Sequence, residues 1–280
     1  MAKKVTRKPT APKKRTTKKK KSFSAVKYYI LLLLFALLCF GGYHYREALS
    51  YYFKFEPDTT KEDKVFQARI YQVLTKHKDF VFGIDVSQYQ GEIEWEEVKE
   101  VEGYPLNYVL IRATAGADKL DKQFQNNWNN AKKANLIRGA YHYYRPNENS
   151  IEQAKNFIKN VHLSKGDFPP VLDIEKLPEN QSIDSLQQGL KRWLQYVDQH
   201  YKVKPIIYTG EKYYNDFLKE DFKGYTFWIA NYNFFVENIK DDWLFWQFTE
   251  KAQIKGIEGK VDVDIYNGTP KMLEYLLISN

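Results

Sequence analysis

The sequence predicts an α/β fold, a closed β/α barrel that follows a single N-terminal transmembrane helix. From Phe80 onward, short apolar runs alternate with segments of helical periodicity, which is the pattern of parallel βαβ units. Eight such strands are enough to close a barrel. An open doubly wound sheet is the alternative, but the sequence has no Gly-x-Gly-x-x-Gly phosphate loop.

The N-terminus carries a basic tail. Residues 1–27 hold twelve of the 43 Lys and Arg residues and no acid, so the rest of the chain has 31 basic residues against 35 acidic ones. Runs of like charge are typical of disordered segments. The positive charge therefore belongs to a cytoplasmic tail and not to a basic face of the fold, and we expect no nucleic-acid partner.

An uncharged apolar segment follows the tail. Residues 28–45 contain the run from Tyr28 to Tyr43, which approaches the roughly 20 residues that a helix needs to cross a bilayer. Tyr at both ends suits the membrane interface, and the positive charges before the run predict a cytoplasmic N-terminus. We expect a single-pass signal anchor that contacts membrane lipid and places the rest of the chain on the extracytoplasmic (periplasmic or cell-wall) side. A cleaved signal peptide is the alternative, but no small-residue cleavage site follows the apolar core, and Leu38 is too large for a lipoprotein site at Cys39.

The next segment is polar and charged. Residues 46–78 predict a stalk or linker between the anchor and the barrel. Within it, Val65, Ile70, Val73 and Leu74 indicate one short amphipathic helix.

Residues 79–280 form the predicted barrel domain. The eight expected strands are 81–86, 108–113, 137–143, 170–174, 205–208, 226–230, 244–248 and 261–266. Helical patterns are expected at 95–101, 124–134, 151–161, 183–197 and 213–218. Little room for helices remains between the last three strands, so the end of the barrel should lack them.

Acidic residues stand at the ends of three strands. Asp173 and Glu175 are two residues apart at the fourth strand, so the pleat points both side chains to the same side. Asp85 ends the first strand, and Asp262 and Asp264 belong to the eighth. Because chemistry in a β/α barrel occurs at the carboxyl ends of the strands, we expect these acids to converge at one mouth. Paired carboxylates of this kind can cleave glycosidic bonds.

Other uses of these acids remain open on the pattern alone. Strand-end acids can cap a following helix or pair with surface lysines, and clustered carboxylates can bind Ca²⁺ or Mg²⁺. The five histidines show no ligand spacing, and Cys39 is the only cysteine, so no intramolecular disulfide can form. We expect no metal and no cofactor.

Aromatic side chains fall at the same strand ends. Their rings can stack on the apolar faces of sugars, and tyrosine hydroxyls can bind polar groups at the same time. Each ring alone is better explained as core, but together with the acids they predict a sugar-binding cleft. The expected substrate-binding residues are Tyr141, Tyr143, Tyr208, Trp228, Tyr232, Trp246, Gln247 and Asp264.

Several motifs occur in a fixed order along the barrel domain. They are Phe82–Gly91, Glu94–Trp95, Ile111–Thr114, Gly139–Tyr143, Pro170–Glu175, Ile206–Thr209, Trp246–Thr249 and Val261–Gly268. In this order they resemble the glycoside hydrolase family 25 lysozymes of the Chalaropsis type. The resemblance implies a modified TIM-like barrel of five β/α units plus three strands. It also implies N-acetylmuramidase activity on the β-1,4 bond between N-acetylmuramic acid and N-acetylglucosamine of peptidoglycan.

The resemblance assigns roles to the acids. Glu175 is expected to be the general acid/base and Asp173 its partner carboxylate, which assists the substrate acetamido group or a water. Asp85 and Asp262 are expected to be supporting active-site acids. Spacing leaves a retaining or an inverting outcome open, and our hypothesis is retention with help from the acetamido group.

Two positions depart from the family pattern. Tyr89 stands where the first motif usually has His, and Ala115 stands where the family usually has Glu. Both belong to the expected rim of the cleft, so they bear on fine specificity for the glycan.

We therefore expect a membrane-anchored peptidoglycan hydrolase with a monomeric catalytic domain. The alternative is a non-hydrolytic glycan-binding barrel that tethers the cell wall to the membrane. Such a barrel would keep the aromatics and lose an acid, whereas this chain keeps Asp85, Asp173, Glu175 and Asp262. A nucleic-acid-binding protein led by the basic tail is a third possibility, and salt-dependent DNA binding that is lost on deleting residues 1–27 would identify it.

Overall fold

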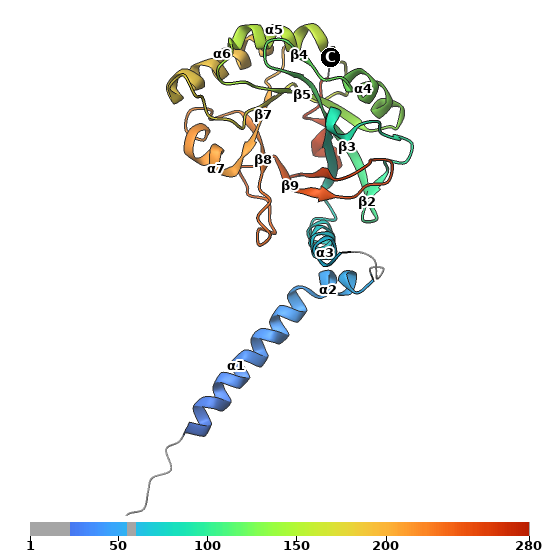
Figure 1. The fold of residues 1–280 in the computed structure, drawn as a ribbon, viewed down its shortest axis with the longest axis vertical. Helices are drawn as coiled ribbons and strands as arrows, with labels where there is room; N and C mark the ends of the chain where they lie inside the picture. The colour runs from blue at the N-terminus through green and yellow to red at the C-terminus, as the bar shows by residue number, and fades with distance from the viewer. Residues whose placement is uncertain (1–22, 55–59, 280) are drawn as a thin grey trace, which may run out of the picture. The chain divides into compact units, whose positions relative to one another are not determined.

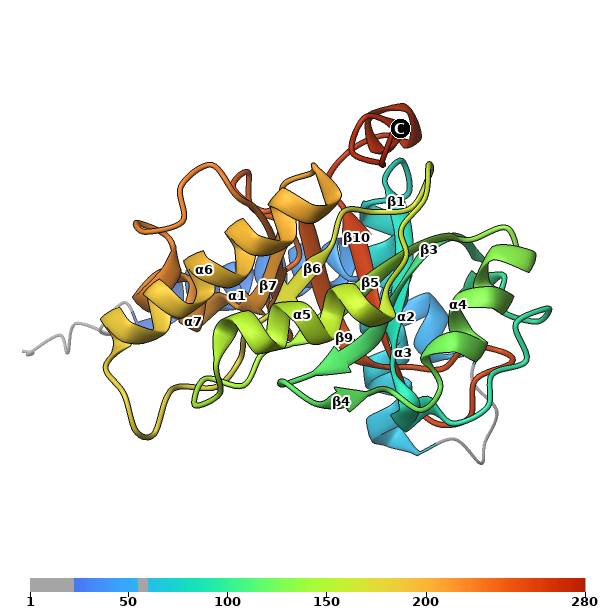
Figure 2. The same cartoon turned by 90° about the horizontal axis from the view of Figure 1, so that it is seen from above.

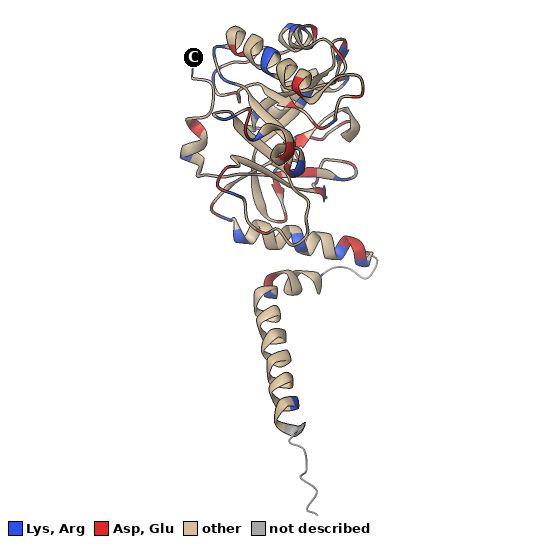
Figure 3. Ribbon diagram, turned by 90° about the vertical axis from the view of Figure 1, so that its left-hand side faces the viewer, with Lys and Arg blue, Asp and Glu red and all other residues tan. Residues whose placement is uncertain are grey.

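The computed structural model describes residues 23–54 and 60–279, and the chain divides after Arg46 into two compact units (Figure 1). The first contains helix α1 (Phe23–His44), whose side chains from Ala25 onward are almost all exposed. Its segment Ala25–His44 is long and apolar enough to cross a membrane, with a mean hydropathy of 2.0. Figure 3 shows the helix free of Asp and Glu, with Lys27 near its start. The apolar helix is therefore present as predicted, and residues 1–22 of the predicted tail lie outside the described part.

The second unit is built on a closed barrel. Its strands are β1 (Val81–Val86), β2 (Glu100–Val101), β3 (Tyr104–Ala115), β4 (Lys119–Leu120), β5 (Ile137–Tyr143), β6 (Val171–Asp173), β7 (Ile206–Gly210), β8 (Thr226–Ala230), β9 (Phe245–Ala252) and β10 (Val261–Tyr266). Strands β1, β3, β5, β6, β7, β8, β9 and β10 pair in this order, and β10 pairs back to β1. These eight strands are the eight that the sequence predicts, so the closed barrel is confirmed.

The last strand differs in direction from the others. From β1 through β9, each barrel strand runs parallel to the next, whereas β10 is antiparallel to both β9 and β1. The carboxyl ends of seven strands and the amino end of β10 therefore meet at one mouth.

Strand alternation divides the core into two layers. Inward-facing residues such as Val81, Tyr108 and Phe245 fill the barrel, and their neighbours pack outward under the helices. Gly83 faces inward, where an added Cβ would lie 2.2 Å from the Tyr108 ring. Glycine at this position lets the tyrosine ring fill the barrel.

Helices cover the barrel after β3, β5, β6 and β7 (Figures 1 and 2). The helices of this region are α4 (Phe124–Lys133), α5 (Ser150–Asn160), α6 (Ile183–Tyr201), α7 (Glu211–Tyr213) with the π-helix η2 (Tyr214–Leu218), and α8 (Pro270–Glu274). Within residues 231–244 and 253–260, all of them described, the chain forms no helix, as predicted. After β1 only the 3₁₀ helix η1 (Gln88–Gln90) forms, so the expected count of five β/α units is not confirmed.

The helix expected at 95–101 is wrong. Trp95 and Val98 are buried, as the pattern indicates, but Trp95 lies in a turn, Val98 in irregular chain, and Val101 is the last residue of β2 before the β2–β3 hairpin turn. Glu102 and Gly103 both have positive φ, which is the geometry of a tight two-residue hairpin turn. The three-residue spacing of apolar residues, which predicts a helix, belongs here to an irregular segment whose apolar side chains contact the core one after another.

The predicted stalk at 46–78 also needs correction. It contains α2 (Arg46–Tyr52) and α3 (Lys61–Lys76), and α3 is the amphipathic helix that the sequence predicts. However, α3 packs on the barrel: Ile70, Val73 and Leu74 belong to its outer core. The helix is part of the barrel unit, and the predicted boundary at residue 79 would cut it away.

We expect Leu74→Ala to lower the free energy of unfolding by about 2–5 kcal/mol, because it deletes a fully buried side chain between α3 and the barrel. Urea unfolding of the full-length protein would measure the change. Val65→Ala, on the same helix but 41% exposed, is the control and should stay within about 0.5 kcal/mol of wild type. Similar small effects of both variants would show that α3 contributes little to the core.

Candidate active site

A cleft of 690 Å³ opens at the mouth where the strand ends meet. Four predicted catalytic acids and six of the eight predicted substrate-binding residues line it. They are Asp85, Asp173, Glu175, Asp262, Tyr141, Tyr143, Tyr208, Trp228, Tyr232 and Gln247. The structure therefore brings together residues from β1, β5, β6, β7, β8, β9 and β10.

Asp173 and Glu175 occupy the end of β6. Asp173 is the last residue of the strand and is 3% exposed, whereas Glu175 follows the strand and faces solvent. The backbone here is held from both sides: the Tyr144 N–H donates to the Asp173 carbonyl at 2.8 Å, and the Ile174 N–H donates to the Tyr208 carbonyl at 3.0 Å. The two carboxyl groups thus differ in environment while they share one fixed segment of chain.

The second pair of acids comes from adjacent antiparallel strands. Asp85 of β1 lies directly opposite Asp262 of β10. Cross-strand partners on one face have side chains in contact range, so two negative charges here repel each other. The barrel mouth therefore concentrates acidic groups that cannot all be ionised at once.

The acids have raised pKa values. Burial raises the pKa of Asp85 well above its usual range, and Asp262 and Asp264 add to the effect. Burial likewise raises the pKa of Asp173, and Glu175 raises it further by charge and by a hydrogen bond. The pKa of Asp262 is raised to about 7, again first by burial. Carboxyl groups in this cleft therefore hold their protons to higher pH than usual, as acid catalysis near neutral pH requires.

We expect Asp262→Asn to gain stability over wild type as pH rises from about 4 to about 7. A folded carboxyl with a raised pKa keeps a proton that the unfolded chain has lost, so wild-type stability falls across that interval. The stability of wild type must be compared with that of the variant at each pH, because a second group also titrates. Buried His142 has its pKa lowered to about 3, so its contribution to stability rises with pH. Urea unfolding at several pH values would measure the stability of the variant minus that of wild type, and a value that stays constant or falls as pH rises would contradict the expectation.

Tyrosine hydroxyls and one amide position the acid of β1. The Tyr208 hydroxyl donates to Gln247 Oε1 at 2.6 Å, and the Tyr232 hydroxyl donates to the same oxygen. The Gln247 amide nitrogen in turn donates to Asp85. This chain of hydrogen bonds fixes Asp85 in the floor of the cleft and ties it to two aromatic walls.

Two predicted substrate-binding residues are not in the cleft. Because β10 is antiparallel, Asp264 lies opposite Gly83, one layer below the mouth, where it accepts a 2.7 Å hydrogen bond from Trp228 Nε1. Trp246 precedes the inward-facing Gln247, so alternation turns it outward, where its ring meets His77. Both predictions are wrong as substrate contacts, since Asp264 holds Trp228 and Trp246 packs in the outer core.

The two departures from the family pattern both line the cleft. Tyr89 is 80% exposed, and its ring lies 4.6 Å from the Arg112 guanidinium. Ala115 ends β3 and presents only a methyl group to the cleft. At the first position the rim is therefore formed by the Tyr89 ring stacked on Arg112, and at the second a methyl group takes the place of a longer side chain.

Arg112 and Asp121 were missed by the sequence prediction. Arg112 follows Tyr108 at even spacing on β3, so alternation alone could have placed its side chain inward. The positive charge of Arg112 opposes the rise in the pKa of Asp173. Asp121 accepts from Arg112 Nε at 2.8 Å and from the Gln88 N–H at 2.9 Å. A local signal was present as well, because Asp121 also accepts from the Gln123 N–H at 2.9 Å, as an aspartate in a turn before a helix does.

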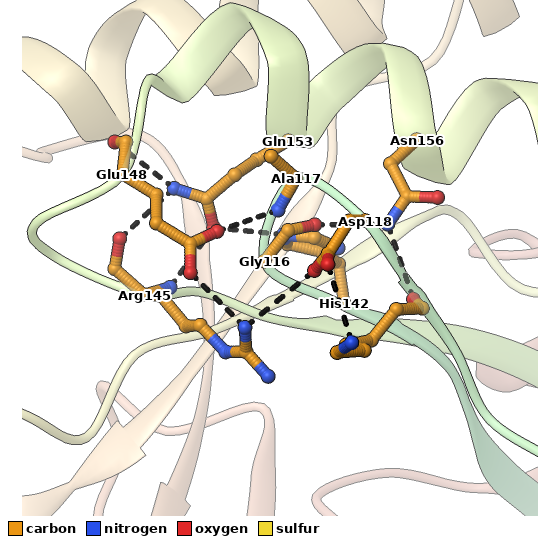
Figure 4. A network of polar contacts seen from close by, with 9 residues as sticks. Gly116, Ala117, Asp118, His142, Arg145, Glu148, Gln153 and Asn156 are labelled. Atoms are coloured by element: carbon orange, nitrogen blue, oxygen red, sulfur yellow. Dashed lines mark hydrogen bonds and ion pairs between the residues drawn. The ribbon is translucent and has the colours of Figure 1, made fainter.

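A polar network fixes the turn between β3 and β4 (Figure 4). Ala115 and Lys119, on either side of this turn, line the cleft. Glu148 accepts from the Ala117 N–H at 2.6 Å and from Arg145 Nη1 at 3.0 Å. Gln153 donates to the Arg145 carbonyl at 2.9 Å. Gly116 has a φ of +58°, and a Cβ there would lie 2.4 Å from Glu148 Oε2. The turn therefore depends on glycine and on charges from the loop before α5.

The chemistry of the cleft points to sugar cleavage. Among the described residues, no three His, Cys, Asp or Glu side chains come together as metal ligands. Acids of unlike environment, surrounded by tyrosine and tryptophan at the mouth of a β/α barrel, are what a carboxylate-dependent glycosidase requires.

Comparison with known proteins defines the family. The family model "Glycosyl hydrolases family 25" matches residues 84–257. The chain belongs to this family, which confirms the predicted resemblance and the predicted glycosidase.

Individual relatives agree with the family match. YegX of Escherichia coli (strain K12) is 37% identical over 216 residues, which cover 75% of this chain and 76% of YegX. Lysozyme M1 of Streptomyces globisporus is 32% identical over 209 residues, which cover 69% and 70% of the two chains. The solved structure of a family 25 glycosyl hydrolase from Bacillus anthracis matches with a TM-score of 0.65 at 28% identity, covering 72% of this chain and 95% of that one.

Proposed function

We propose that the protein is a membrane-anchored muramidase that cleaves the β-1,4 bond between N-acetylmuramic acid and N-acetylglucosamine in peptidoglycan. The observation that carries the proposal is the pair Asp173 and Glu175, one buried and one exposed, at a strand end in a cleft of acids and aromatic rings. The names of two relatives, Lysozyme M1 and N,O-diacetylmuramidase, support the same substrate.

In the proposed reaction Glu175 is the general acid and base. Its exposed position lets it reach the glycosidic oxygen of a bound strand and donate a proton to the leaving sugar. Asp173, buried beside it, holds the substrate acetamido group as that group attacks the sugar carbon, and Asp85 and Asp262 support the developing charge. This route retains the anomeric configuration, and NMR detection of an initially inverted product would exclude it.

We propose further that α1 is an uncleaved anchor. Its run of apolar side chains and the positive charges before it support a cytoplasmic N-terminus, with the barrel unit outside the cytoplasm. We propose a monomeric barrel unit. Mass spectrometry of the protein from isolated membranes would detect the intact N-terminus. A mature chain that begins after α1 would show instead that the helix is a cleaved signal.

The test of the function is digestion of purified peptidoglycan by the full-length protein, with mass spectrometry of the soluble products. Muramidase activity yields fragments with reducing N-acetylmuramic acid ends. The rival function is a wall tether without hydrolysis, because the same aromatic cleft could bind glycan strands. A folded protein that sediments with the wall and releases nothing would favour the tether.

A further inference from the structure

A second hollow lies beside the cleft, between α3 and the barrel. It has a volume of 250 Å³, and its walls come from α3, from the loop after β8 and from β9. Phe66 and Ile70 on α3 line it together with Phe234 and Phe248. We call this hollow the α3 groove.

The α3 groove adjoins the cleft. Tyr232 and Glu250 line both, so a strand that leaves the cleft past Tyr232 would reach the groove. The Tyr232 hydroxyl donates to Gln247, which holds the shared wall against the catalytic acids. The groove thus extends the surface on which a polymer in the cleft would lie.

The walls of the groove are held together by hydrogen bonds. Arg69 Nε on α3 donates to the Phe234 carbonyl at 2.7 Å, and Gln67 Nε2 donates to the Lys251 carbonyl at 2.9 Å. These bonds join α3 to both other walls, so the groove is fixed in the folded unit. The family match begins at residue 84, so α3, which ends at Lys76, supplies its wall from outside the matched segment.

The chemistry of the groove fits a sugar ring. Phe66, Phe234 and Tyr232 provide flat apolar surfaces, and the Lys251 ammonium lies 3.7 Å from the Phe66 ring centroid. Glu250 adds a carboxylate at the junction with the cleft. A pyranose with an N-acetyl group is complementary to these walls, because its apolar faces can stack on the rings and its hydroxyl and amide groups can bind the charged side chains. The volume lies below the roughly 300–1,000 Å³ of drug-sized pockets, which suits a single sugar.

We propose that the α3 groove is an additional saccharide subsite, which binds a sugar of the same peptidoglycan strand beyond the residues held in the cleft. The inference rests on the proposed function and adds to it a preference for long strands. A strand that reaches the groove is bound by both surfaces, whereas a short oligosaccharide is bound by the cleft alone.

The test compares two substrates on the full-length protein in lipid nanodiscs: long peptide-free glycan strands and the shortest oligosaccharide that wild type cleaves. We expect Phe66→Ala to raise KM for the long strands about threefold to tenfold, through loss of one stacking contact, with kcat unchanged. Both constants for the short substrate should stay at wild-type values. Phe66→Trp should retain the long-strand KM, because it keeps a flat ring.

Controls separate the groove from general damage. Val65→Ala changes the neighbouring exposed residue of α3 and should leave both substrates unaffected, and Phe234→Ala should reproduce the effect of Phe66→Ala from the opposite wall. Equal KM values of wild type and Phe66→Ala on long strands would overturn the inference, as would a KM that rises equally for both substrates. No cleavage of either substrate by wild type would overturn the proposed function itself.

Discussion

Glu175→Gln is expected to lower kcat on peptidoglycan by about 10²–10⁴-fold, which is the usual contribution of a positioned proton donor. Gln keeps the size of Glu but cannot donate a carboxyl proton to the leaving oxygen. Glu175 lies outside β6 and is exposed, so the substitution leaves the apolar core unchanged. Release of reducing ends from purified peptidoglycan measures the loss.

The matched control is Glu179→Gln. Glu179 is an exposed glutamate of the same loop, and it is not among the residues that line the cleft. Glu179→Gln should keep the wild-type kcat. Glu175→Gln should still sediment with the cell wall, because the aromatic side chains of the cleft are intact. Activity of Glu175→Gln within a few-fold of wild type would remove Glu175 from the role of acid.

The periodicity of the strands carried most of the fold prediction. A strand buried on both faces reads as a short apolar run, and eight such runs between turn residues left few alternatives to a closed barrel. The same alternation places Asp85 and Asp173 inward at the ends of β1 and β6. These positions depend on local geometry, and the sequence is sufficient to give them.

The errors arise where position depends on contacts between distant segments. The direction of β10, which determines that Asp262 lies at the mouth and Asp264 below it, is an exception. The connection from Ala252 to Val261 is too short for a parallel crossover, so the antiparallel pairing of β9 and β10 could have been predicted. The packing of α3 depends on surfaces of β9 that lie far along the chain, so a polar helix after a linker was interpreted as a stalk. The error at Trp246 was avoidable. Adjacent residues of a strand point to opposite faces, so Trp246 and Gln247 could not both line the cleft.

Asp173→Asn is expected to lower kcat/KM by about 10²–10³-fold, the effect of removing one preorganised group that stabilises charge in the transition state. The ionised Asp173 is required to hold the substrate acetamido group as positive charge develops at the sugar carbon. Asn has the same shape and can fill the same site between β5 and β7, where Asp173 pairs with Tyr143 and Tyr208. Steady-state kinetics on peptidoglycan fragments would measure the loss.

The same variant should be more stable than wild type at neutral pH. Burial and the neighbouring Glu175 raise the pKa of Asp173, so the folded state opposes its ionisation, and the neutral Asn avoids that opposition. At pH values below the usual range of an aspartate, where both folded and unfolded chains hold the proton, the difference should vanish. Loss of activity together with a higher Tm at neutral pH therefore identifies Asp173 as a catalytic group whose charge destabilises the folded barrel. Loss of activity with a lower Tm at every pH would show instead that Asp173 holds the end of β6 in place.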